Sequence, residues 1–340
     1  MKKPVLIVSL CLGIAGFVAA QGGTVQLQAA GATFPAPIYT KWFDAYKKIN
    51  PKIEVNYQPV GSGGGIRQLI AKTVDFGASD GPMTDEQLGQ AGFKILHFPT
   101  VLGADVPSYN VPGVNTPLKF TGKALAGIFL GTINKWNDPE ITKANPGVKL
   151  PGEDIVVVHR SDGSGTTYIW TDFLSKVSPE WKAKTGGPGT SINWPTGLGG
   201  AKNDGVTGLI KQTPNSIGYI ELTYAIQNNI EYGDVQNSSG NFVKATLASV
   251  SEAAAGAAKD MPEDFRVSIT NAPGKTAYPI SSFTWLLIPA QIQDTGKREI
   301  IKGFLNWMLK DGQGYCEGLA YAKLPPPVVV KEAKAISLIK

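Results

Sequence analysis

The chain has 340 residues, of which 42% are hydrophobic and 17% charged, and its 32 basic and 27 acidic residues give a formal net charge of +5. This length exceeds what one core comfortably holds, so two domains are expected. The weak positive charge, without an arginine cluster, gives no electrostatic support for nucleic-acid binding.

The first twenty residues have the pattern of a secretory signal peptide. Lys2 and Lys3 precede an apolar run that is short for a membrane span, and residues 18–20 before Gln21 suit cleavage. The alternative is that this segment is not cleaved and anchors the protein in the membrane. We therefore expect an exported protein whose mature form keeps one cysteine, Cys316, as a buried apolar residue without a disulfide partner.

Strands and helices alternate along the mature chain. The first predicted helix, over 38–49, has its apolar residues at helical spacing: Ile38, Trp42, Tyr46 and Ile49. Further helices are predicted at 66–74, 122–141 (a helix and a turn), 166–177 and 297–311. Strands are predicted at 53–60, 74–79, 154–160 and 278–289, and residues 215–228 are predicted to form a strand followed by a short helix. Strands that alternate with helices indicate an α/β architecture.

Three glycine-containing turns with hydroxyl groups stand before three of these helices. They are "GATFPAP" from Gly31, "GSGGG" from Gly61 and "RSDGSGT" from Arg160. A helix N-terminus offers unpaired N–H groups and about half a positive charge, and glycine allows close approach of a ligand. One such turn alone more often only caps its helix. Three turns and one of the chain's four arginines are better explained by a small tetrahedral oxyanion bound at the carboxyl ends of the strands.

Asp80 directly follows the strand predicted at 74–79. A carboxylate beside an anion needs an explanation, because like charges repel. An ionised carboxylate only accepts hydrogen bonds, so it suits inorganic phosphate, which keeps a P–OH proton at neutral pH, and repels sulfate, which has none. The alternative role for Asp80 is a helix N-cap, although Thr84 fits that role better. Asp162 is expected to hold the guanidinium of Arg160, or to be a turn residue before Gly163.

Five segments carry a resemblance to a known family: "GATFPAP", "VDFGASD", "RSDGSGT", "WPTGLGGAKNDGV" (194–206) and "IGYIELTYA". They resemble the periplasmic phosphate-binding proteins of bacterial high-affinity phosphate ABC importers, over about residues 29–310. The resemblance implies a two-lobed periplasmic-binding-protein fold of α/β class, each lobe a mixed sheet flanked by helices, with the ligand in the cleft between the lobes. It implies a discontinuous first lobe, 21–103 and 279–340, and a second lobe, 104–278.

The same resemblance implies a ligand set and partners. Matched motif by motif, the phosphate-binding residues are Thr33, Phe34, Ser62, Asp80, Arg160, Asp162, Ser164, Gly165 and Thr166. Thr33 and Phe34 would donate backbone N–H groups, Asp80 would accept the phosphate proton, and Arg160 would be the charged donor. The implied protein is a periplasmic monomer that needs no cofactor and delivers inorganic phosphate to the transmembrane permease subunits of an ABC transporter.

Three rival functions are kept open by the sequence. A secreted phosphatase would need metal ligands or a nucleophile, but the two histidines, His97 and His159, are far apart in sequence and no catalytic motif occurs. His97 is expected in a strand, and strand alternation turns His159 away from Arg160 and from the site. The second rival is a binder of sulfate, molybdate or tungstate, and the third is an extracellular adhesin or scavenger with the same site.

Overall fold

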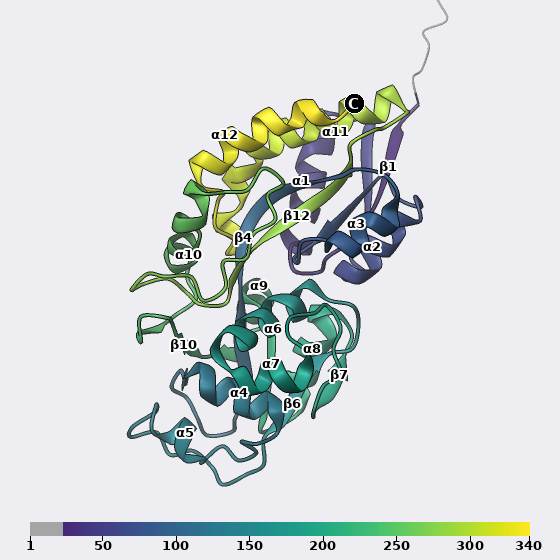
Figure 1. Cartoon of the computed structure of the whole chain (residues 1–340). Coiled ribbons are helices and arrows are strands. Elements are labelled where there is room, and N and C mark those ends of the chain that lie inside the picture. Colours follow the sequence, from purple (N-terminus) through teal and green to yellow (C-terminus); the bar gives the residue numbers. More distant parts are fainter. Residues whose placement is uncertain (1–22) are drawn as a thin grey trace, which may run out of the picture.

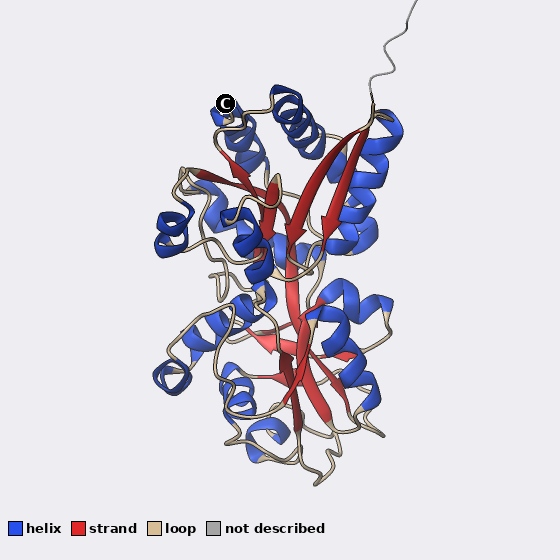
Figure 2. Cartoon of the chain, turned by 90° about the vertical axis from the view of Figure 1, so that its right-hand side faces the viewer, coloured by secondary structure: helices blue, strands red, loops and turns tan. Residues whose placement is uncertain are grey.

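One long strand runs through both halves of the molecule. The structure is a computed structural model that describes residues 23–340, so the predicted signal peptide (1–20) lies outside the described residues. The strand is β4 (Ile95–Asn110); its first part pairs with β12 (Ser281–Pro289), and its last part, from Asp105, pairs with β8 (Ser216–Glu221). Figures 1 and 2 show the two lobes above and below this crossing.

The upper lobe contains a mixed sheet in the order β2-β1-β3-β12-β4. β1 pairs in parallel with β2 and β3, whereas β12 is antiparallel to both β3 and β4. The remaining elements of this lobe are β1 (Val25–Gly31), α1 (Ala36–Ile49), β2 (Ile53–Gln58), α2 (Ser62–Ile70), β3 (Phe76–Ser79), α3 (Asp85–Ala91), α11 (Thr295–Leu309) and α12 (Pro326–Ala335). Short 3-10 helices lie at Gly312–Tyr315, Glu317–Leu319 and Ile336–Leu338.

The lower lobe contains the second part of the sheet, in the order β4-β8-β6-β7, with β9 paired to β4. β8 is antiparallel to β4 and parallel to β6, so this sheet is mixed as well. The elements are α4 (Gly122–Leu130), α5 (Pro139–Thr142), β6 (Val156–Arg160), α6 (Gly165–Val177), α7 (Pro179–Thr185), β7 (Leu198–Gly200), α8 (Lys202–Gln212), α9 (Leu222–Gln227) and β9 (Glu231–Tyr232). The two mixed sheets with their helices confirm the predicted α/β, two-lobed class.

A third, small sheet and one more helix complete the chain. The small sheet has the order β11-β10-β5, from β5 (Lys119–Phe120), β10 (Asp234–Gln236) and β11 (Phe242–Val243). The helix α10 (Leu247–Lys259) contacts β4, β12 and α12. Arg266 then donates to the backbone oxygen of Met83 at 3.0 Å. The lobe limits 21–103, 104–278 and 279–340 stay a prediction, although these contacts place α10 and Arg266 against elements of the upper lobe.

Two local predictions about helices are wrong. Ile49, assigned to the buried face of α1, is 60% exposed at the end of that helix, whereas Tyr39 and Phe43 complete its buried face. Only Gly61 of "GSGGG" stands in the turn ahead of the helix, because α2 already begins at Ser62. The glycines inside the helix permit close packing: a Cβ on Gly65 would overlap the Cα of Gly31 in the neighbouring turn.

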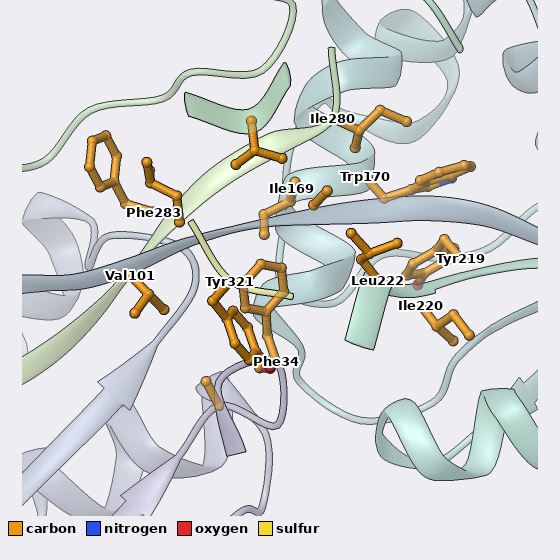
Figure 3. Close-up of a cluster of buried hydrophobic side chains, with 14 of the residues drawn as sticks. Phe34, Val101, Ile169, Trp170, Tyr219, Ile220, Leu222, Ile280, Phe283 and Tyr321 are labelled. Carbon is orange, nitrogen blue, oxygen red and sulfur yellow. The ribbon is translucent and has the colours of Figure 1, made fainter. Parts of the chain in front are cut away.

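The hydrophobic core continues through the crossing point of the lobes. Figure 3 shows Phe34 and Tyr321 beside the long strand, and Trp170 with Tyr219 further along it. The ring centroids of Phe34 and Tyr321 are 6.4 Å apart, and Trp170 stacks on Tyr219 at 5.1 Å. Cys316 is fully buried in this core, as predicted. Within residues 23–340, no helix combines the length and the apolar character that a membrane crossing requires.

Candidate anion-binding site

The three predicted turns meet where the lobes face each other. Thr33 and Phe34 lie between β1 and α1, Ser62 is the first residue of α2, and Asp80 directly follows β3. All four come from the upper lobe. The lower lobe contributes Arg160 at the end of β6 and the turn that leads into α6.

The two lobes are in direct contact across this site. The backbone N–H of Gly63 donates to the carbonyl of Gly163 at 2.9 Å. The hydroxyl of Tyr224 donates to the carbonyl of Thr33 at 2.7 Å. The first bond joins the beginning of α2 to the turn that follows Arg160. The second bond joins the turn that contains Thr33 to α9, so the two lobes are closed on each other in this structure.

Gly165 shows how closely the predicted residues approach one another. It is the first residue of α6, and a Cβ on it would lie 2.5 Å from both Asp80 Oδ2 and Ser62 Oγ. No side chain fits there, because real Cβ atoms do not make such contacts. The structure thus brings Ser62 and Asp80 of one lobe against the helix start of the other.

The site holds many hydrogen-bond donors that the protein itself does not use. Besides the N–H of Gly64, within residues 23–340 no acceptor is found for five buried backbone N–H groups of the three turns. They belong to Thr33, Phe34, Ser62, Gly165 and Thr166. Buried N–H groups are nearly always paired in folded proteins. Five unpaired ones at the same place therefore indicate that a ligand supplies the acceptors.

Arg160 adds a fixed positive charge to these neutral donors. Its guanidinium is buried and pairs with Asp162 through Nε at 2.8 Å and Nη2 at 2.6 Å, while Nη1 donates to Thr166 Oγ1 at 3.1 Å. Two of the five N–H bonds of the guanidinium have no partner among the described residues. Burial raises the pKa of Asp162, but the hydrogen bond and charge of Arg160 outweigh it and hold that pKa below its ordinary value. Asp162 therefore stays ionised and fixes the guanidinium in one orientation.

Asp80 is the acceptor of the site. It is buried, and its Oδ1 accepts from Thr284 Oγ1 at 2.7 Å. Burial raises the pKa of Asp80 to about 7, against the lowering effects of the Thr284 bond, the charge of Arg160 and Ser62. Above this pKa the carboxylate is ionised and can only accept hydrogen bonds, so a ligand oxygen that contacts it must carry a hydrogen.

Two of the nine predicted residues do not turn their side chains into the site. The ring of Phe34 packs on Gly103 and Tyr321, so only its backbone N–H can serve a ligand. The carboxylate of Asp162 faces Arg160 and the backbone N–H of Lys202 at 2.8 Å, so it acts through the arginine.

The sequence analysis missed several residues that hold the site together. They are Asn203, Tyr219, Tyr224 and Thr284, each buried and each bonded to a predicted site residue. Asn203 lies inside the "WPTGLGGAKNDGV" segment, and Tyr219 and Tyr224 lie inside "IGYIELTYA", so the resemblance gave a signal for these three. Thr284 lies in an apolar strand pattern that gives no sign of a polar role.

The histidines lie away from this site, as the strand alternation predicted for His159. The ring of His159 stacks on Trp194 at 4.8 Å, while the side chain of Arg160 points to Asp162. His97 lies in β4, where its Nε2 accepts from the backbone N–H of Met83 at 3.1 Å. Within residues 23–340, no three His, Cys, Asp or Glu side chains form a group suited to a metal ion.

Comparisons with known proteins agree with this geometry. The model of the PBP superfamily domain matches residues 18–311. The phosphate-binding protein PstS of Pasteurella multocida is 45% identical over 303 residues, which cover 89% of this chain and 87% of that protein. The PstS of Haemophilus influenzae is 42% identical and covers 97% of this chain and 96% of its own length. The structure of a phosphate-binding protein from Stenotrophomonas maltophilia has the same fold, with a TM-score of 0.70 at 18% identity, covering 91% of this chain and 93% of that one.

Proposed function

The chain belongs to the PBP superfamily and to the family of PstS phosphate-binding proteins, and we propose that it captures inorganic phosphate between its lobes and delivers it to an ABC-type importer. The observation that carries this proposal is the set of unused buried donors from both lobes around one acceptor, Asp80. A small ligand with several oxygens and one hydrogen matches that set.

Hydrogen phosphate would supply a partner for each kind of group in this set. Its unprotonated oxygens would accept from the five backbone N–H groups, the hydroxyls of the turns and the two free N–H bonds of Arg160. Its P–OH would donate to Asp80. Neutral donors fix the geometry of the ion, and Arg160 offsets part of its charge. Several charge-assisted bonds of about 1.5–3 kcal/mol each are enough for micromolar or tighter affinity, which is about 8 kcal/mol or more.

Binding would hold the lobes closed. Ser62 and Asp80 belong to one lobe and Arg160, Gly165 and Thr166 to the other, so a phosphate bonded to both lobes stabilises only the closed form. The permease subunits of the importer would favour the open form, and the open form would release the ion. We propose that the protein acts as an exported periplasmic monomer after removal of residues 1–20.

We further propose that the protein is a binder and not a phosphatase. The histidines contact Trp194 and Met83 instead of the anion site, so neither imidazole can act as a base on the hydroxyls of the turns. Incubation with a chromogenic phosphate ester, with and without divalent metals, tests this directly. Metal-stimulated turnover would contradict a pure binding role.

Equilibrium dialysis with labelled phosphate tests the proposed ligand. We expect saturable binding of one phosphate per chain with a Kd in the micromolar range or below. Absence of saturable binding by the mature protein would overturn the proposed function. N-terminal sequencing of the exported protein checks the location, and a first residue other than Gln21 would contradict the cleavage site.

A further inference from the structure

Asn203 is a buried amide that touches the site from behind. It is the second residue of α8, fully buried, and its Nδ2 donates to Thr33 Oγ1 at 2.9 Å and to Thr166 Oγ1 at 3.3 Å. Thr33 belongs to the upper lobe and Thr166 to the lower. This one amide group therefore connects two hydroxyls that come from opposite sides of the site.

The orientation of the Asn203 amide is set by the backbone. Its Oδ1 accepts from the N–H of Glu221 at 3.1 Å. A backbone N–H can only donate, so the oxygen of the amide must face Glu221 and the NH₂ group must face the two threonines. The exchange of oxygen and nitrogen that often remains ambiguous in Asn side chains is excluded here.

This orientation decides the direction in which both hydroxyls can act. A hydroxyl has one hydrogen and two lone pairs. Thr166 Oγ1 accepts from Asn203 and from Arg160 Nη1, so both of its lone pairs are used. Thr33 Oγ1 accepts from Asn203. In the part of the chain that the structure describes, neither hydroxyl donates to a protein acceptor. Their hydrogens are left for a ligand.

We infer that Asn203 is a positioning residue that makes Thr33 and Thr166 hydrogen-bond donors toward the bound anion, and that it does so for Thr33 only when the lobes close. This inference rests on the proposed phosphate-binding function. Because the Asn203–Thr33 bond spans the lobes, closure itself turns the Thr33 hydroxyl into an oriented donor. Asn203 thus favours an ion whose oxygens beside Thr33 and Thr166 are unprotonated. Asp80 favours an ion whose oxygen beside the carboxylate carries a hydrogen.

The test uses two substitutions of Asn203 and phosphate titration calorimetry on the full mature chain. In Asn203→Ala the hydroxyls rotate freely but can still donate, so phosphate binding should weaken about tenfold. In Asn203→Asp the carboxylate accepts from both hydroxyls and adds a negative charge, so binding should weaken at least about 100-fold. Equal binding by wild type and both variants would overturn the inference.

A mutant cycle separates positioning from a merely structural role. If Asn203 acts through the two hydroxyls, Asn203→Ala should weaken binding less than about twofold in a Thr33→Val/Thr166→Val background. An equal loss of phosphate affinity on Asn203→Ala in that background and in wild type would overturn the inference. This test does not require Asn203→Asp to fold.

A matched control is a buried amide of the lower lobe outside the site. Asn145 makes three hydrogen bonds, to Lys119 twice and to Ile141. Asn145→Ala should lower thermal stability but keep the phosphate Kd within about twofold of wild type. A wild-type chain without any phosphate binding would overturn the proposed function instead, so the two failures are distinguishable.

Discussion

Substitution of Gly165 by alanine should weaken phosphate binding without unfolding the protein. The added methyl carbon would lie 2.5 Å from Asp80 Oδ2 and Ser62 Oγ and 2.6 Å from Asp80 Cβ. These are atoms of the opposite lobe, so the clash exists only when the lobes are closed. Overpacking costs about 1–3 kcal/mol, which corresponds to a loss of affinity of about 5- to 150-fold.

The ligand-free protein should tolerate the same change. Gly165 begins α6, where alanine favours a helix more than glycine does, so an open Gly165→Ala protein should unfold at the same temperature as wild type or slightly higher. Calorimetric titration with phosphate and a thermal melt without it measure the two effects. Gly208→Ala is the control, because a Cβ there meets nothing within 4 Å in α8 of the same lobe. Wild-type affinity in Gly165→Ala would refute the convergence of the two lobes on one ligand.

Three more substitutions test separate parts of the account. Arg160→Ala should weaken phosphate and every other anion at least about 100-fold in dialysis, because it removes the buried charged donor; selective loss of one anion would contradict this role. Asp162→Asn should weaken phosphate about tenfold in the same assay through the looser guanidinium, and an unchanged Kd would show that Asp162 does not orient it. Glu332 of α12 is buried without a hydrogen-bond partner among the described residues, and burial raises its pKa well above its ordinary value. The folded state keeps this proton after the unfolded state has lost it, so stability falls as pH rises above about 4.5. Glu332→Leu should therefore stabilise the chain by about 1–3 kcal/mol at pH 8 and by less at pH 5 in urea unfolding, and a pH-independent effect would contradict the assignment.

Regular patterns in the sequence predicted much of the fold and of the site. The helical spacing in α1 and α6 and the apolar run of β6 correspond to buried elements of the structure. Thr84 caps α3 with a reciprocal bond to Gln87, as its position before "DEQL" indicated. Local signals of this kind are legible because they depend on neighbours a few residues away.

Features that depend on distant partners could not be predicted. β4 is the clearest case: Gly103, Asp105 and Pro107 interrupt any apolar alternation, yet the strand runs for 16 residues because β12 and β8 cover it in turn. Asp105 is buried there without a hydrogen-bond partner among the described residues. Asn203 acquires its role only when Thr33, 170 positions earlier in the chain, lies beside it. No spacing within one segment contains that information.

The central claim is that Asp80 accepts the hydrogen of a protonated tetrahedral ion held by both lobes. Parallel calorimetric titrations of wild type and Asp80→Asn with phosphate and sulfate at pH 8.5, where the carboxyl of Asp80 is ionised and phosphate still carries a hydrogen, test it most directly. The account predicts that wild type prefers phosphate by a factor of about 10⁴ or more and that Asp80→Asn loses much of this preference, because an amide can donate to sulfate. Sulfate binding by wild type as tight as phosphate binding would contradict the role of Asp80 and with it the account of the site.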